Sequence, residues 1–267
     1  MVLPVAFSCL VSAPRAGSAE QEFAFGYFGY SRHSTTVEPD EAGFKKEYSG
    51  SSSLYPTAAA VRFDDGFYLK LDYEGTFAAL ATFLNFGSVS GSADAEDTSA
   101  SGAKLYAGHM SGLLIPRAEM GLGFATDIGY LGFGMNLDLA SMGLSASKDF
   151  SAKMQNPGTV FDFGAQVQYV YTVWPGFHVN PSFTYNLMFT DRQQTPIDGT
   201  GMNLETSVTF KVLPFLSLYG TVGYDSRSFK EISGNGDDAH LSDVAMKLAI
   251  ALHDIPSPFS NSVYGHN

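Results

Sequence analysis

The sequence predicts an all-β chain: a closed antiparallel up-and-down transmembrane β-barrel, with ten strands and a range of about eight to twelve. First, apolar and polar residues alternate with a period of two from residue 22 to residue 253, which gives each strand one apolar and one polar face. Second, tight turns alternate with long polar connections, as in transmembrane barrels. Third, the alternating segments are about 9–14 residues long, enough for a tilted strand to cross a bilayer.

Composition narrows the class of protein. Charged residues make up only 16% of the 267 residues, whereas a soluble domain has about a quarter. The chain has 15 Lys and Arg against 27 Asp and Glu, a net charge of −12, so it lacks the basic surface that nucleic-acid binding needs. No run reaches the roughly 18 apolar residues of a transmembrane helix. A single Cys excludes a disulfide scaffold.

The two ends differ from the alternating region. Residues 1–19 are expected to be a signal peptide, because Met1–Leu10 is apolar and the small residues Gly17–Ala19 precede Glu20. No base precedes the apolar run, which leaves a truncated start or an unusual export signal as alternatives. The barrel is expected over 20–253, followed by a C-terminal tail over 254–267.

Ten strands follow from the alternation, taken in chain order. In the third strand Leu69 and Leu71 oppose Lys70 and Asp72, and in the eighth Leu204 and Val208 oppose neighbours such as Glu205. No charged residue falls on the apolar face of a predicted strand, as expected for a surface that contacts lipid. The predicted strands are 22–32, 54–63, 67–79, 112–125, 129–142, 159–173, 177–189, 201–212, 216–229 and 241–253.

The connections are of two kinds. Tight turns are predicted at 64–66, 126–129, 174–176 and 213–214, and long polar connections at about 32–53, 88–103, 145–158, 190–200 and 230–240. Aromatic residues gather near the strand ends, where the interfacial girdles of a barrel lie. The alternative is a soluble sandwich or barrel with its apolar face turned inward. Short turns at one rim and long loops at the other favour the membrane barrel.

The stretch 76–115 departs from the pattern. From Thr76 to Leu84 the apolar residues lose the two-residue period and recur at helical spacing. A short helix on the rim or in the mouth is one interpretation. A pair of strands that extend well beyond the membrane is the other.

The whole pattern over 22–253 resembles the bacterial outer-membrane β-barrel proteins, in particular the small porin-like or OmpW-like class, without identifying one family. The resemblance implies a location in the bacterial outer membrane, contact with the lipid bilayer and the outer-membrane assembly machinery, and a monomer. One feature departs from these proteins, which commonly end on a strand with a terminal aromatic residue. Here the last strand ends near His253, and the tail follows.

The polar faces supply candidate lumen residues. Two hypotheses apply: the charges pair into a plug, or an excess of acids attracts cations into a narrow pore. The first choice is a narrow passive channel or conduit for small solutes or ions, with a net-acidic lumen. The alternative is a structural or adhesive surface barrel whose long acidic loops bind partners. The predicted pore-lining residues are Arg62, Lys70, Asp72, Glu74, Arg117, Glu119, Asp138, Asp162, Glu205, Lys211, Asp225, Asp243 and Lys247.

Catalytic and metal sites are not expected. Ten strands resemble the omptin proteases, which carry an Asp-x-His pair and a separate Asp pair. The sequence has Asp238-Ala239-His240, but its adjacent acids Asp64-Asp65 fall in a short turn at the opposite end. The acids of Asp94–Asp97 lack the spacing of a Ca²⁺ loop. No group of His and Cys is clustered in the sequence as a zinc site requires, so no metal or cofactor is predicted.

Overall fold

The computed structural model describes residues 23–39, 47–52, 54–64, 66–77, 91–93, 102–113, 115–127, 129–146, 154–190, 197–230 and 238–253. The predicted signal peptide and C-terminal tail lie outside these residues, and so do residues 78–90, 94–101 and 114 of the irregular 76–115 stretch. The described strands account for all ten predicted ones.

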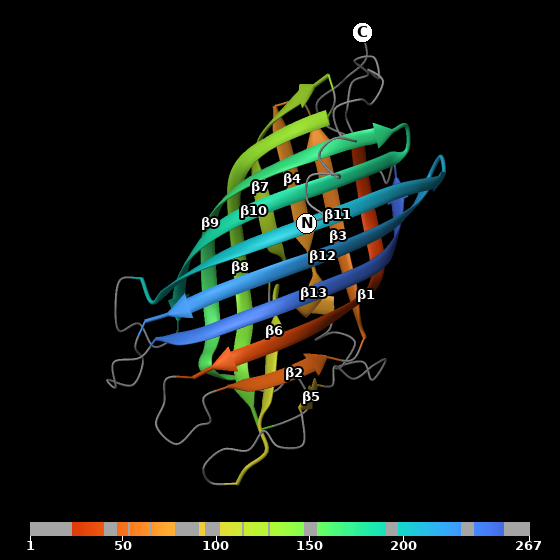
Figure 1. Cartoon of the computed structure of the whole chain (residues 1–267). Coiled ribbons are helices and arrows are strands. Elements are labelled where there is room, and N and C mark those ends of the chain that lie inside the picture. Colours follow the sequence, from red (N-terminus) through yellow and green to blue (C-terminus); the bar gives the residue numbers. More distant parts are fainter. Residues whose placement is uncertain are drawn as a thin grey trace, which may run out of the picture.

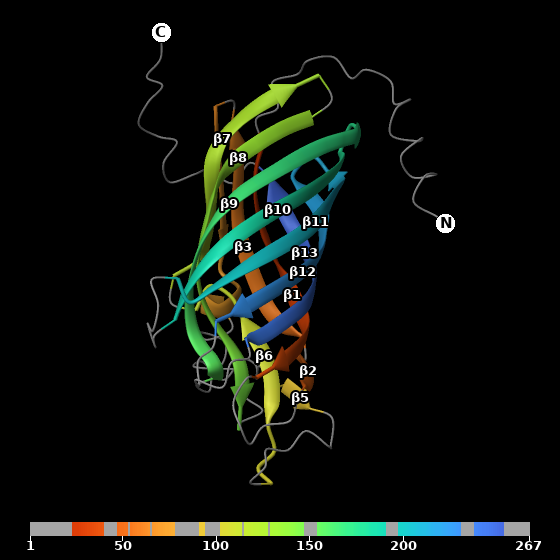
Figure 2. The same ribbon diagram turned by 60° about the vertical axis from the view of Figure 1, so that its left-hand side comes forward.

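Ten antiparallel strands form a closed ring (Figures 1 and 2). Each strand pairs with the next along the barrel, and β1 closes the ring against β13, from Phe25 opposite His253 to Glu38 opposite His240. The predicted closed ten-stranded barrel is therefore confirmed. Its strands are β1 (Phe23–Glu38), β3 (Tyr55–Asp64), β4 (Phe67–Asp72), β7 (Arg117–Thr126), β8 (Gly129–Ser145), β9 (Gln155–Trp174), β10 (Phe177–Thr190), β11 (Gly199–Leu213), β12 (Leu216–Phe229) and β13 (Ala239–His253).

Three short strands lie at one end of the barrel (Figure 1). They are β2 (Tyr48–Ser52), which pairs with β1, β5 (Gly91–Ala93), which pairs with β2, and β6 (Tyr106–Met110), which pairs with β8. We call β2, β5 and β6 the cap. The cap lies at the end of the barrel where the long connections begin. At this end β1 and β8 run past their predicted ends, to Glu38 and Ser145, and β2 and β6 pair with them there.

Two predicted strands are shorter in the structure. The strand predicted over 67–79 ends at Asp72, because the chain turns into a short helix over residues 74–77; Tyr73 N still donates to Ala58 O of β3 (2.8 Å). The strand predicted over 112–125 begins at Arg117. A positive φ of 68° at Gly112 breaks the extended backbone before it. The wall is thus interrupted between β4 and β6.

The tight turns join β3 to β4, β7 to β8, β9 to β10 and β11 to β12, all at the barrel end opposite the cap. Gly66 and Gly176 occupy left-handed conformations there, with φ of 89° and 87°. Only glycine adopts this region without steric cost, which explains glycine at these two turns. The predicted rim of short turns is confirmed.

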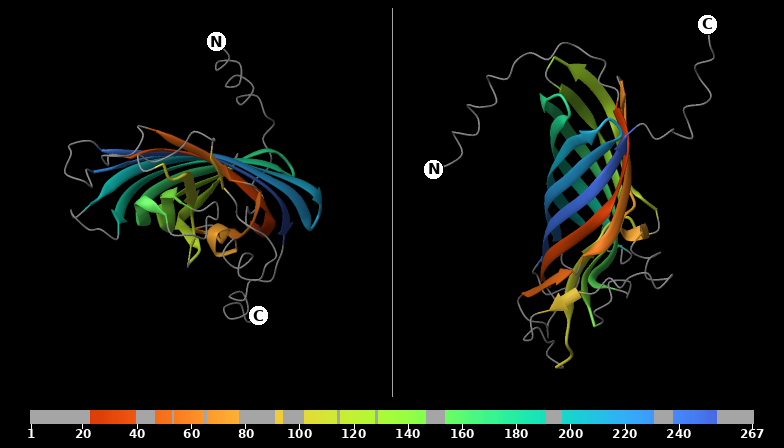
Figure 3. Two further views of the ribbon diagram at one scale, coloured as in Figure 1. Left: turned by 90° about the horizontal axis from the view of Figure 1, so that it is seen from below. Right: turned by 90° about the vertical axis from the view of Figure 1, so that its right-hand side faces the viewer.

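The outer face of the strands is apolar. Leu248 is 76% exposed, Leu122 61% and Phe133 50%, whereas the intervening residues of the same strands point inward. Figure 3 shows the strands tilted across the barrel. A closed barrel with an apolar exterior and a polar interior satisfies every backbone group inside hydrocarbon. The chain is therefore an outer-membrane barrel.

Among the described residues, no helix has the length and hydropathy needed to cross a bilayer.

The interior has three layers. The end with the short turns holds an aromatic layer, in which Tyr27 stacks on Tyr219 with ring centroids 4.3 Å apart and Phe63 meets Tyr130 at 5.2 Å. The cap end holds a second apolar layer, which includes Met142, Met188, Phe229 and Tyr48. Charged side chains occupy the middle. This middle layer contains the candidate site.

Candidate functional site

Most of the predicted lumen residues do point into the barrel. Alternation places them there, because β4, β7, β8, β9, β11, β12 and β13 turn their apolar side chains to the outside. Glu74 comes instead from the short helix that follows β4. The inward-facing set is Lys70, Asp72, Glu74, Arg117, Glu119, Asp138, Asp162, Glu205, Asp225, Asp243 and Lys247.

Two predicted lumen residues are not enclosed in the barrel. Arg62 is on the outer face of β3, where it forms an ion pair with Asp64. This corrects the expectation for Arg62: the apolar residues Val61 and Phe63 take the inward positions of β3, because they belong to the aromatic layer. Lys211 lies opposite the buried Ser217 and so keeps the inward side of β11, but it is exposed at the rim of short turns.

One part of the charged layer is centred on Lys70. Its Nζ lies 2.7 Å from Glu205 Oε1 and 3.3 Å from Glu119 Oε1. Arg117 Nη2 lies 2.8 Å from the same Glu119 oxygen, and Gln166 Nε2 donates to the other oxygen at 2.6 Å. Glu119 is therefore neutralised by Lys70 of the neighbouring strand β4 and by Arg117 of its own strand, and Glu205 is neutralised by Lys70 from across the lumen.

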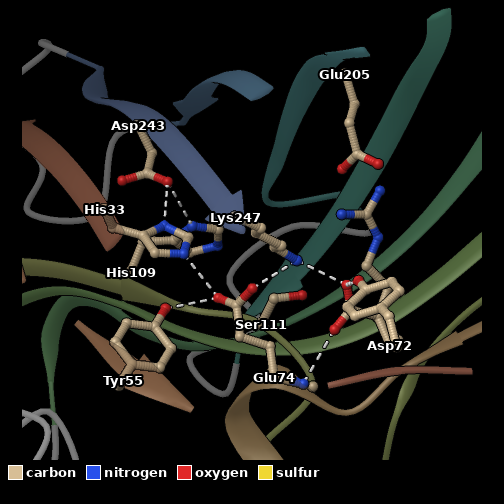
Figure 4. A network of polar contacts seen from close by, with 12 residues as sticks. His33, Tyr55, Asp72, Glu74, His109, Ser111, Glu205, Asp243 and Lys247 are labelled. Atoms are coloured by element: carbon tan, nitrogen blue, oxygen red, sulfur yellow. Dashed lines mark hydrogen bonds and ion pairs between the residues drawn. The ribbon is translucent and has the colours of Figure 1, made fainter. Parts of the chain in front are cut away.

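A second part is centred on Lys247 (Figure 4). Its Nζ lies 2.7 Å from Asp72 Oδ2 and 2.6 Å from Glu74 Oε2. Each of these two carboxylates also accepts a hydrogen bond from a tyrosine. Tyr27 OH donates to Asp72 (3.1 Å), and Tyr55 OH donates to Glu74 Oε1 (2.7 Å). One lysine thus joins β13 to β4 and to the short helix.

A third part is centred on Arg227, which the sequence analysis did not identify. Its Nε and Nη2 donate to the two oxygens of Asp225 at 2.9 and 2.7 Å, and its Nη1 pairs with Asp162. Arg227 lies two residues after Asp225 in β12, so both side chains point to the same side of the strand. The predicted inward position of Asp225 therefore also predicts that Arg227 faces the lumen.

In the described part of the chain, Asp138 is not paired with a cation of this layer. It accepts from Ser111 Oγ at 2.6 Å and from Gly112 N at 2.9 Å.

A histidine pair lies beside the Lys247 group (Figure 4). His33 Nδ1 lies 2.6 Å from Asp243 Oδ2, and His33 Nε2 lies 2.7 Å from Glu74 Oε1. His109 Nδ1 lies 3.3 Å from the same Asp243 oxygen. Sequence reasoning missed both histidines, because His33 follows the predicted end of the first strand and His109 falls in the stretch without clear periodicity.

Little space remains between these groups. A cavity of about 30 Å³ borders His33, His109, Glu205 and Lys247. A second cavity of about 20 Å³ borders Lys70 and the aromatic layer. Volumes of this size hold only one or two water molecules. The 2.7 Å ion pair between Lys70 and Glu205 lies between them, since each partner lines a different cavity.

The omptin-like residues are far apart in the structure. Asp238 and His240 are exposed at the cap end, at the start of β13, whereas Asp64 lies at the opposite rim. Among the described residues, no pair of aspartates faces His240. The chain therefore does not assemble the omptin arrangement from these residues.

No family model and no curated protein sequence matches the chain. Three solved structures illustrate what its fold is similar to. They are the outer membrane protease OmpT from Escherichia coli (10% identity, 88% of this chain and 97% of that chain covered, TM-score 0.39), Neisserial surface protein A (9%, 85% and 96%, 0.32), and the outer membrane protein OprG from Pseudomonas aeruginosa (8%, 90% and 97%, 0.30). The closed ring of strands and its apolar exterior identify the class of protein. The chain is a bacterial outer-membrane β-barrel of ten strands.

Proposed function

We propose that this protein is a closed-lumen barrel with a structural or adhesive role, exerted by the cap and the connections around it. The observation that carries the proposal is the charged layer. Its acids pair with Lys70, Arg117, Arg227 and Lys247, or with hydroxyl and backbone donors. Such pairing supports a plug that replaces a hydrophobic core.

A passive channel needs a continuous path for water. The cavities of about 30 and 20 Å³ that border the charged layer share no lining residue, and apolar layers lie on both sides of the charges. All five residues of β6 are buried, which places this strand inside the cap end. These features favour a role at the surface over passive conduction. The acids of Asp94–Asp97 suit a partner with basic groups.

A narrow conduit for small solutes or ions is the second candidate. It is favoured by the net-acidic lumen and by the two cavities on either side of the Lys70–Glu205 pair. Conduction would require that this pair separates and that the cap moves. The proposed partners in either case are the lipid bilayer and the outer-membrane assembly machinery. No catalytic role is proposed.

Two assays test the surface role. Proteoliposomes that contain the barrel should swell in isotonic small sugars no faster than protein-free liposomes. Cells that display the barrel should adhere to a cationic surface, and replacement of residues 94–100 by neutral Gly and Ser should reduce adhesion. Sugar-size-dependent swelling, together with unchanged adhesion in the replaced variant, would support the conduit instead.

A further inference from the structure

We propose that His33, His109 and Asp243 bind a divalent transition metal ion, with Zn²⁺ as the best match, next to Glu74. One ligand atom from each of the three residues lies within 4.8 Å of the others, and all three side chains are buried. They come from β1, β6 and β13, and Figure 4 shows both imidazoles facing the Asp243 carboxylate. This site does not depend on whether the lumen conducts.

His109 is weakly held in the absence of a metal. It is 6% exposed, its Nδ1 lies 3.3 Å from Asp243 Oδ2, and its Nε2 has no hydrogen-bond partner among the described residues. A buried polar atom without a partner is destabilising. A metal ion held between His109 and Asp243 provides a reason to keep a second histidine at this position.

The donor set fits a transition metal. Two imidazole nitrogens and one carboxylate oxygen are ligands that Zn²⁺ accepts in tetrahedral geometry, with one position left for a water or a fourth ligand. Glu74 lies 2.7 Å from His33 and lines the same cavity of about 30 Å³. Because Glu74 contacts His33 Nε2 and Asp243 contacts His33 Nδ1, Glu74 holds the ring from behind, and the fourth position is left to a water in this cavity. A site with imidazole ligands disfavours Ca²⁺ and Mg²⁺, which prefer oxygen.

Neighbouring side chains already orient the ligands. Thr35 Oγ1 donates to Asp243 Oδ1 at 2.7 Å, which directs the other oxygen, Oδ2, to the two histidines. Tyr55 OH donates to Glu74. Hydrogen bonds of this kind behind the ligands are typical of metal sites and tune their affinity.

The position of the site gives it a structural consequence. Within the described residues, β6 pairs only with β8, whereas β2 and β5 extend from β1 on the other side. The wall is therefore not continuous at the cap end. A metal ion between His109 of β6, His33 of β1 and Asp243 of β13 would link β6 to two barrel strands with which it does not pair.

Without a metal, the same residues form a different arrangement. His33 then bridges Asp243 and Glu74 through its two ring nitrogens, and His109 Nδ1 contacts the same Asp243 oxygen. Metal binding requires that the ligating nitrogen carries no proton. The two arrangements are distinguished by the contribution of His109.

The test uses the full-chain barrel, purified in detergent and freed of metal with a chelator. Co²⁺ is titrated while the visible absorption is recorded, and Zn²⁺ is then added as a competitor. We expect one Co²⁺ per barrel with the intense bands of tetrahedral coordination, displacement by Zn²⁺, and a higher unfolding temperature with Zn²⁺ bound. His109→Ala should weaken binding at least about tenfold and remove the thermal shift.

Two further variants keep the test decisive. Thr35→Val retains all ligands but removes the donor to Asp243, so it should weaken binding by about 10–100-fold. His240→Ala is the matched control, since His240 is exposed on β13, three residues from Asp243, and it should bind as the unmodified barrel does. Absence of stoichiometric binding to the unmodified barrel, or equal binding by the His109→Ala variant, would overturn the proposal.

Discussion

At the scale of single residues, the interior of this barrel is held by buried ion pairs. Lys70 and Lys247 each contact two carboxylates, and Arg227 contacts two more. Removing one partner of such a pair costs about 3–5 kcal/mol, because the other charge is left buried and unpaired. The lumen side chains therefore contribute to stability as a set.

The variant Asp72→Asn/Asp138→Asn/Glu205→Gln tests this at the residue scale. It removes one partner of Lys247, one partner of Lys70 and the acceptor of Ser111. We expect the free energy of unfolding, measured by urea titration in lipid vesicles, to fall by a few kcal/mol. The exposed Asp127→Asn serves as control and should change it by less than about 0.5 kcal/mol. Unchanged stability in the triple variant would contradict the plug.

The sequence correctly predicted the lumen-facing residues of strands whose apolar side chains face the lipid. It failed at Arg62, because β3 turns Val61 and Phe63 inward and leaves Ala58 and Ala60 on the lipid side. Alternation alone does not say which face of a strand is the inside. The pairing partners of the charges were not predictable either, since Lys247 meets Asp72 across 175 positions of chain.

At the scale of elements, Tyr130 joins β8 to the turn between β3 and β4. Its hydroxyl lies 2.9 Å from both Asp64 O and Phe67 O, which share it as donor, and the residue is fully buried. Gly123 makes room for this ring, because a Cβ at Gly123 would lie 1.5 Å from the hydroxyl. The rim of short turns thus depends on a glycine and a tyrosine on neighbouring strands.

Gly123→Ala should therefore destabilise the barrel by about 1–3 kcal/mol, the usual cost of overpacking a filled interior. Gly220→Ala is the matched control, because the nearest atom to its added Cβ is 3.7 Å away, at Leu248. The measurement is the unfolding midpoint of both variants in the same detergent. Equal midpoints for the two would refute the role given to Tyr130.

The apolar exterior of β13 supports a prediction about the bilayer. Leu248 and Leu252 face outward on the same strand, and Leu252 lies next to the rim of short turns. Leu248→Arg should make insertion less favourable by about 2–4 kcal/mol, and Leu252→Arg by about 0–1 kcal/mol. Folding yields into lipid vesicles across a urea series give both values. Equal penalties at the two positions would contradict the orientation of the strand.

The ends of the elements were less predictable than their existence. The strand predicted over 67–79 stops at Asp72, where the two-residue period itself weakens after Tyr73. The pairing of β6 with β8 was not predicted, because five residues without alternation carry no strand signal. Both misses concern the cap end, and the candidate metal site lies there.

At the scale of the whole molecule, three interior layers distinguish this barrel from a water-filled tube. An aromatic layer, a charged layer and a second apolar layer follow one another from the short turns to the cap. A ten-stranded barrel is close to the size that side chains alone can fill. The sequence predicted the ring and the acid excess, but both a plug and a pore satisfy those two features. Side-chain pairing was needed to favour the plug.

The measurement that tests the closed lumen most directly is a planar-bilayer recording of the purified, refolded full chain. The account predicts no steady conductance for the unmodified barrel in symmetric KCl. It also predicts no steady conductance for the Glu205→Gln variant, which should instead have a lower free energy of unfolding. A steady cation-selective conductance in the unmodified barrel, lost or reduced in selectivity on neutralising Glu205, would contradict the closed lumen and establish the conduit.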